Sequence, residues 1–213
     1  MNTNKLDLLS EKLRPQSIQD CVLSDRLMGK FLQMENRQAP IMNMMFYGSP
    51  GLGKTTVAHA LVKAAADDMS CYFLNGSKSK GMRAVEDISH FATTVSLSGK
   101  SKICVVDEAD HLTDDAQAAL RSLIEQVQNN CRFIFTLNEL KRMSLALRSR
   151  LIPVCFDLTL DEMESASNRY LERVRKLLPE LGHRIDDAEL KSIIRAHFPD
   201  YRAIANNIEF ACF

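Results

Sequence analysis

The sequence has no excess of charge, no closely spaced cysteine pair and no long apolar run. With 27 Lys+Arg against 27 Asp+Glu, bulk charge gives no support to nucleic-acid binding, which would need a local basic patch. None of the six cysteines forms a C-x-x-C pair, and the five histidines show no H-E-x-x-H spacing, so we expect reduced thiols and no zinc site. No apolar run approaches the ~20 residues of a membrane span, and no secretory segment opens the sequence, so we expect a soluble, cytoplasmic protein with no membrane partner.

The composition is that of a globular protein, with 46% hydrophobic and 25% charged residues. Five apolar runs read as strands, and helical patterns at 55–66 and from Asp114 onward lie between them. This alternation predicts an α/β fold, a parallel sheet flanked by helices on both faces. The strand candidates are Met42–Tyr47, Cys71–Leu74, Ile103–Val106, Arg132–Leu137 and Val154–Leu158.

The chain changes character at Thr159, where the strand patterns stop. Three helical patterns follow, at 161–178, 186–197 and 200–213, and Gly182 and Pro199 separate them. We therefore predict two domains: residues 1–158 form the α/β domain and residues 159–213 a small all-α domain.

A phosphate-binding loop lies between the first strand and the first long helix. The residues fit the pattern G-x-x-x-x-G-K-[ST], whose glycines let backbone N–H groups approach phosphates at a helix N-terminus. Lys54 is expected to reach the β- and γ-phosphates of ATP, and the Thr55 hydroxyl to ligate Mg²⁺. The motif is Gly48-Ser49-Pro50-Gly51-Leu52-Gly53-Lys54-Thr55.

Two carboxylates follow the wholly apolar strand Ile103–Val106. In a P-loop fold this is the position of the metal-holding carboxylate, so Asp107 is expected to hold Mg²⁺ and Glu108 to polarise the attacking water. A glutamate here favours hydrolysis of ATP over storage.

Other candidates are ambiguous from residue chemistry alone. Asn138 is either a strand-ending asparagine or a residue that orients the water or contacts the γ-phosphate. Arg148 and Arg150 are typical of a solvated helix end. Lys80 and Arg83, with Lys78, form a basic cluster in a polar stretch, for which a solvated loop is the plainer interpretation.

Taken together, these segments resemble the AAA+ ATPases, and specifically the clamp-loader ATPase subunits, which have a RecA-like sheet followed by a helical lid. The stretch Val105–Asp110 with Ala116–Arg121 resembles the small subunits of replication factor C. The stretch Glu11–Asp20 resembles the family's opening box. The segments Asn75–Ser77 and Phe198–Arg202 resemble the clamp-loader large subunit of T-even-type bacteriophages even more closely.

The resemblance implies roles for the ambiguous residues. Asn138 matches the sensor-1 position and Arg202 the sensor-2 position, which reaches from the lid to the γ-phosphate. Arg150 matches an arginine finger that acts on the ATP of a neighbouring subunit, with Leu151 replacing the family's cysteine. Lys80 and Arg83 match a region that contacts DNA phosphates without base specificity. The nucleotide-binding set is then completed by Arg14 and Thr56.

The implied partners are ATP with Mg²⁺, a sliding clamp, primer–template DNA and other clamp-loader subunits, in the host cytoplasm if the chain is phage-encoded. Family members carry a third, collar domain after the lid, which holds their subunits together, and this sequence stops before it. A lone chain has no neighbour to offer Arg150, so it is expected to hydrolyse ATP poorly. The alternatives are another AAA+ machine of the branch-migration or helicase-loader type, and a nucleotide-gated adaptor with little turnover. The Asp107–Asp110 tetrapeptide also occurs in DEAD-box helicases, but the chain has no room for their second domain.

Overall fold

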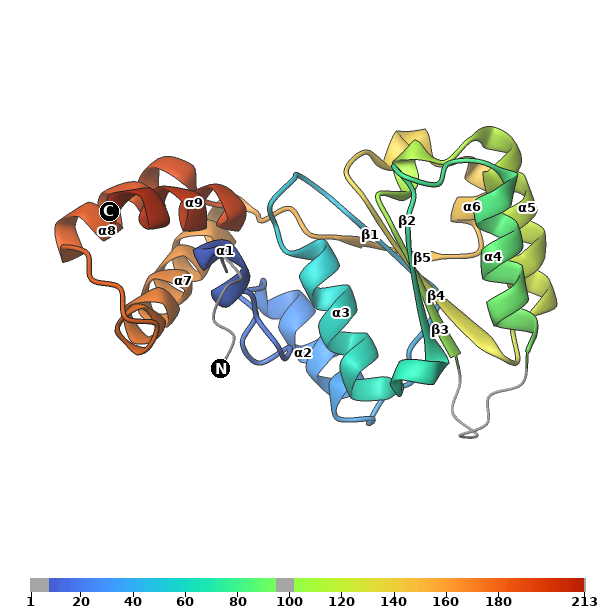
Figure 1. Ribbon diagram of the computed structural model, residues 1–213, viewed down its shortest axis with the longest axis horizontal. Helices are drawn as coiled ribbons and strands as arrows, with labels where there is room; N and C mark the ends of the chain where they lie inside the picture. Colours follow the sequence, from blue (N-terminus) through green and yellow to red (C-terminus); the bar gives the residue numbers. More distant parts are fainter. Residues whose placement is uncertain (1–7, 95–101, 213) are drawn as a thin grey trace, which may run out of the picture.

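The computed structural model describes residues 8–94 and 102–212, so the outermost predicted domain limits, at 1 and 213, fall outside this description. A five-stranded, wholly parallel sheet has the strand order β2-β3-β4-β1-β5. The prediction of an α/β fold with a parallel sheet flanked by helices is confirmed (Figure 1). The strands are β1 (Met44–Tyr47), β2 (Cys71–Asn75), β3 (Lys102–Asp107), β4 (Cys131–Leu137) and β5 (Ile152–Cys155).

Helices cover both faces of the sheet, α2 and α3 on one and α4 and α5 on the other, and α7, α8 and α9 form a separate group beside them (Figure 1). Among the described residues the longest helix is α7, which follows the last strand and begins the C-terminal group of helices. The helices are α1 (Leu9–Lys12), α2 (Asp25–Glu35), α3 (Lys54–Ala65), α4 (Met82–Thr93), α5 (Asp114–Gln126), α6 (Leu145–Arg148), α7 (Leu160–Glu180), α8 (Asp187–His197) and α9 (Tyr201–Ala211), with short 3-10 turns at Asp68–Ser70, Ala109–His111 and Leu140–Arg142.

Alternate side chains of each strand enter opposite cores, as a pleated strand requires. In β1, Phe46 packs on the α2–α3 side and Met45 on the α4–α5 side. The ring of Phe46 lies 5.4 Å from that of Phe31 in α2 and 5.1 Å from that of Phe156 after β5. Burying each such side chain contributes roughly 1.5–3 kcal/mol, so the sheet's position against α2 is firmly set.

The lid has its own apolar core, formed by α7, α8 and α9. Two residues from the predicted first domain join it: Leu9 and Leu13, in and just after α1, are buried among the lid side chains. The backbone N–H of Leu9 also donates to the Glu209 carboxylate at 3.1 Å. The start of the described chain therefore packs on the lid, not on the sheet.

Two predicted local features differ from the structure. The last strand, expected at Val154–Leu158, runs from Ile152 to Cys155. The buried ring of Phe156 produced the later apolar signal, and its N–H still donates to the Tyr47 carbonyl at 2.8 Å. The basic stretch expected as a solvated loop leads directly into α4, and Arg83 lies in the first turn of that helix. No helix in the described part of the chain is both long and apolar enough to cross a membrane.

Candidate functional site

A cavity of about 640 Å³ lies between the carboxyl edge of the sheet and the lid. It collects most of the residues predicted from the motifs. Gly48, Ser49, Arg150, Lys80 and Arg83 do not line it. The predicted residues that do are Arg14, Pro50, Gly51, Leu52, Gly53, Lys54, Thr55, Thr56, Asp107, Glu108, Asn138 and Arg202.

The loop between β1 and α3 has the backbone of a phosphate cradle. Gly51 and Gly53 adopt left-handed conformations, with φ of 79° and 82°, which side-chain-bearing residues rarely adopt. Helix α3 begins immediately afterwards, at Lys54. The first N–H groups of a helix have no intrahelical acceptor and lie at the positive end of its dipole, so this end of the cavity favours an anion.

The ammonium of Lys54 is buried at the centre of the site, with the side chain only 7% exposed. Its Nζ donates to the Gly48 carbonyl at 2.7 Å, to the Ser49 carbonyl at 2.8 Å and to Asn138 Oδ1 at 3.0 Å. Burial lowers the pKa of Lys54. The nearby charges of Asp157, Asp110 and Asp107 raise this pKa, but the effect of burial is larger. The three acceptors are neutral, so the ammonium keeps an uncompensated attraction for a ligand anion.

The carboxylate of Asp107 is held by two hydroxyl groups. Thr55 Oγ1 donates to Asp107 Oδ1 at 2.7 Å, and Thr136 Oγ1 donates to the same oxygen. The backbone N–H of Glu108 in turn donates to Thr136 Oγ1 at 3.2 Å. The buried threonine of β4 thus fixes both carboxylate-bearing residues at the end of β3.

Glu108 has a left-handed backbone, with φ of 53°. For a residue with a Cβ this conformation costs about 1–2 kcal/mol, and such strain concentrates at functional sites. Gly76, after β2, approaches closely: its N–H donates to the Asp107 carbonyl at 2.7 Å, and a Cβ there would lie 2.7 Å from the Glu108 carbonyl oxygen. The strained turn is therefore held from both neighbouring strands.

The lid closes the cavity through the start of α9. The Asp200 carboxylate caps this helix by accepting from the N–H groups of Arg202 and Ala203, both at 3.0 Å. The Tyr201 N–H donates to the Gly51 carbonyl at 3.2 Å, and its hydroxyl donates to the Val22 carbonyl at 2.9 Å. These contacts place Arg202 over the phosphate-binding loop.

The remaining predicted residues lie outside the cavity. Arg150 forms an ion pair with Glu125 of α5, with its Nη2 at 2.6 Å from Glu125 Oε1. Lys80 and Arg83 are exposed at the start of α4. Arg14 lines the cavity and pairs with Glu11 at 3.0 Å.

The donor set suits a small hard cation bound together with phosphate. Mg²⁺ prefers oxygen ligands and is usually held by one or two protein groups plus substrate phosphates and waters. Thr55 and Asp107 supply a hydroxyl and a carboxylate whose oxygens lie 2.7 Å apart. The described residues contain no cluster of three or more His, Cys, Asp or Glu that would hold a metal without a ligand.

Sequence reasoning missed four residues that shape this site. No role was assigned to Thr136, Asp110, Asp157 or Tyr201, although Asp110 and Tyr201 lie in segments that resemble the clamp-loader subunits. Asp110 Oδ2 accepts the N–H of Asn138 at 3.3 Å, and Asp157 Oδ1 accepts the N–H of Ser49 at 2.8 Å. A usable signal existed for Thr136, which precedes Asn138 near the end of a strand that was predicted correctly. Asp157 fell inside the strand predicted at Val154–Leu158, and only the observed end of β5 at Cys155 places it beyond the strand.

A family model described as "ATPase family associated with various cellular activities (AAA)" matches residues 44–156. The chain belongs to the AAA family of ATPases. The match runs from β1 through β5 and so contains the phosphate-binding loop, Asp107, Glu108 and Asn138. The family membership implies ATP binding by this AAA ATPase.

Relatives extend the likeness into the lid. The replication factor C small subunit of Haloarcula marismortui is 32% identical over 205 residues, which are 94% of this chain and 61% of that protein. The sliding-clamp-loader large subunit of Enterobacteria phage T4 is 29% identical over 208 residues, 96% of this chain and 65% of that protein. This AAA ATPase therefore spans between three fifths and two thirds of the length of these relatives.

Among solved structures, the Thermotoga maritima RuvB Holliday junction branch migration motor has the same fold. It superposes with a TM-score of 0.67 at 22% identity and covers 93% of this chain and 64% of that one. At this identity the likeness concerns the fold alone. The sheet and the C-terminal helices of this AAA ATPase are thus arranged as in that structure.

Proposed function

We propose that this AAA ATPase binds ATP with Mg²⁺ in the cavity under the lid, hydrolyses it, and acts as a subunit of a machine that loads sliding clamps onto primer–template DNA. One observation carries the ATPase part. Lys54 and Thr55, adjacent in α3, contact Asn138 and Asp107 from two neighbouring strand ends across a single cavity.

Within this proposal, ATP phosphates replace the neutral acceptors of Lys54. The Gly48 and Ser49 carbonyls and the Asn138 amide satisfy its ammonium in the structure. Phosphate oxygens bind the ammonium more strongly because they carry a negative charge, whereas these three acceptors are neutral. Asn138 is then free to orient a water or the γ-phosphate, and Arg202 contacts the same phosphate from the lid. Arg14 and Thr56 complete the walls of the nucleotide site.

Thr55 and Asp107 are the proposed holders of Mg²⁺, which when bound neutralises charge on the β- and γ-phosphates. Glu108 has the role of polarising the attacking water, with its backbone fixed by the hydrogen bond to Thr136. Arg150 does not line its own cavity and pairs with Glu125. It is the proposed arginine finger for ATP bound to another subunit, where it leaves Glu125 for the transferred phosphate.

The clamp-loader part rests on the named relatives, a replication factor C small subunit and a sliding-clamp-loader large subunit, whose likeness covers sheet and lid alike. In this role a sliding clamp, primer–template DNA and other loader subunits are the partners. Lys80 and Arg83, exposed at the start of α4, are the proposed contacts to DNA phosphates, which require charge but no base recognition.

The test measures ATP binding and turnover separately. Lys54→Ala is expected to abolish binding of a fluorescent ATP analogue. Glu108→Gln is expected to keep binding and to lower turnover roughly 100-fold or more, the contribution of a positioned general base. Glu172→Gln, an exposed change in the lid, is the matched control and should alter neither quantity.

Adding a sliding clamp, primer–template DNA and partner loader subunits should raise turnover, and Arg150→Ala should remove only that increase. A turnover rate that does not change when clamp and DNA are added would contradict the clamp-loader role, but not the proposed ATPase activity. Binding without turnover under every condition would instead favour a nucleotide-gated adaptor.

A further inference from the structure

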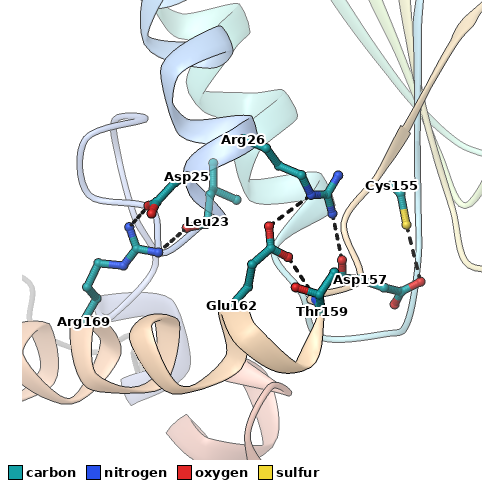
Figure 2. A network of polar contacts seen from close by, with 8 residues as sticks. All are labelled: Leu23, Asp25, Arg26, Cys155, Asp157, Thr159, Glu162 and Arg169. Atoms are coloured by element: carbon teal, nitrogen blue, oxygen red, sulfur yellow. Dashed lines mark hydrogen bonds and ion pairs between the residues drawn. The ribbon is translucent and has the colours of Figure 1, made fainter.

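A continuous chain of polar contacts joins the phosphate-binding loop to the first turn of the lid. Asp157, immediately beyond β5, accepts the Ser49 N–H on its Oδ1 at 2.8 Å. The carbonyl of Asp157 accepts from Arg26 Nη2 at 2.8 Å, and Arg26 Nε donates to Glu162 Oε1 at 3.2 Å (Figure 2). The loop, helix α2 and helix α7 therefore meet through one aspartate and one arginine.

Glu162 connects this chain of contacts to the orientation of the lid. Its other oxygen accepts the Thr159 N–H at 2.9 Å and forms a capping box that starts α7 (Figure 2). Arg26 itself lies in the first turn of α2, which is anchored on the sheet by the buried Leu27 and Phe31. Any rotation of α7 about its first residues therefore moves Glu162 relative to Arg26.

Asp157 lies in tight contact with the root of the loop. A Cβ on Gly48 would come within 3.1 Å of both the backbone nitrogen and Oδ1 of Asp157, so a side chain there would force Asp157 to shift by a few tenths of an ångström. The φ of 139° at Gly48 also favours glycine. Burial raises the pKa of the Asp157 carboxyl, but hydrogen bonds from Ser49 and the charge of Lys54 outweigh that effect and lower it. The acceptor of the Ser49 N–H is thus an ionised carboxylate, which strengthens the bond.

We propose that Asp157 and Arg26 are positioning residues for nucleotide binding: Asp157 fixes the phosphate-binding loop at Ser49, and Arg26 makes that geometry depend on the position of the lid through Glu162. This inference rests on the proposed function, because it takes the nucleotide to occupy the loop. Neither residue lines the cavity, so both act on the ligand indirectly: through the backbone that they hold and, for Asp157, also through its charge near Lys54.

The experiment measures the Kd of a fluorescent ATP analogue together with KM and kcat. Asp157→Ala removes the acceptor of the Ser49 N–H and should raise Kd and KM about tenfold, the effect of one hydrogen bond to a charged group. The kcat should change much less, because the groups that act on the phosphate remain in place. Asp157→Asn keeps an acceptor oxygen and should restore most of the affinity.

Arg26→Gln should raise Kd about threefold, the size of effect expected for a partly exposed ion pair. The decisive result is the double variant with Asp157→Ala, which should bind no more weakly than Asp157→Ala alone, because Arg26 acts through Asp157. Arg175→Gln breaks an exposed ion-pair cluster within the lid and serves as the matched control, with no change in Kd.

Two results would overturn the positioning role and leave the proposed function standing. One is a double variant in which the two increases in Kd multiply; the other is a Kd that is unchanged in both single variants while Lys54→Ala abolishes binding. If Lys54→Ala also leaves binding unchanged, the proposed function fails instead. Thermal unfolding checks that each variant is folded. If Asp157→Ala does not fold, Arg26→Gln and Glu162→Gln replace it in the test. Each must raise Kd, and the double variant must bind no more weakly than either single variant, because both substitutions break the same ion pair.

Discussion

Replacing Gly51 with alanine probes whether the lid rests on the phosphate-binding loop. A Cβ at this position would lie 2.0 Å from Oδ1 of Asp200, far inside van der Waals contact. The carboxylate would have to rotate away and abandon its two hydrogen bonds to the first N–H groups of α9. Gly53 provides a matched comparison, because it has nearly the same φ, 82° against 79°, and nothing within 4 Å of its Cβ position.

Both variants place an alanine in the left-handed region and should lose about 1–2 kcal/mol of unfolding free energy for that reason. Gly51→Ala additionally loses the helix cap, which contributes about 0.5–2 kcal/mol. We therefore expect Gly51→Ala to be less stable than Gly53→Ala by about 1 kcal/mol or more. Urea unfolding followed by circular dichroism measures this difference, since the sequence contains no tryptophan to report by fluorescence.

The same comparison in an Asp200→Ala background isolates the contact. With the carboxylate absent, the two glycine substitutions should have equal effects to within about 0.5 kcal/mol, the usual tolerance of additive changes. Equal effects already in the wild-type background would refute the reasoning, because the lid would then be shown not to press on the loop.

Two further predictions concern stability. Tyr201→Phe removes the hydrogen bond from the hydroxyl to the Val22 carbonyl and should lower the free energy of unfolding, measured with urea, by about 1 kcal/mol. Tyr170→Phe is the comparison: the Tyr170 hydroxyl lies 3.5 Å from its acceptor, so its removal should lower the free energy of unfolding by less. Burial raises the pKa of Cys21 from 9.0 to about 12, so between these values the unfolded chain releases a proton that the native chain keeps. The contribution of the protonated Cys21 thiol to the free energy of unfolding is fully present below pH 9 and is lost as the pH rises through about 12. In Cys21→Ala, the free energy of unfolding should therefore fall less steeply with pH in this range, by up to about 1.4 kcal/mol per pH unit. An unchanged slope of unfolding free energy against pH would contradict this prediction.

The central strands β1, β3 and β4 were predictable because they are largely buried on both faces and so form short, mostly apolar runs. The edge strand β2 is more exposed but is also apolar in sequence. Ile103–Val106 lies inside β3, and Cys71–Leu74 inside β2. Helix α4 was missed although Ala84, Val85, Ile88 and Ala92 form a buried face, because the preceding lysines and Arg83 made the stretch look like a solvated loop. The helical spacing of these apolar residues is a better indicator than the charges, since exposed charges are normal on a helix that packs one face only.

The site divides in the same way. The loop and the pair Asp107–Glu108 have fixed local spacing and could be located from sequence, whereas Thr136 and Asp157 act through contacts between residues far apart along the chain. Thr136 meets Asp107 only because β3 and β4 are neighbours in the sheet. Asp157 meets Ser49 only because β5 pairs with β1. Strand order, which no local pattern contains, created both contacts.

The edge strand β5 carries a proline in its interior, at Pro153, in register with Met45 of β1. The neighbouring Ile152 donates its N–H inward to Asn43, so position 153 faces the open side of the sheet, where proline offers no donor. A proline there is a barrier to strand addition, the usual route by which exposed sheet edges aggregate. Backbone pairing along β5 is therefore interrupted at Pro153, and crowding many copies together should not lead to fusion of their sheets along this strand.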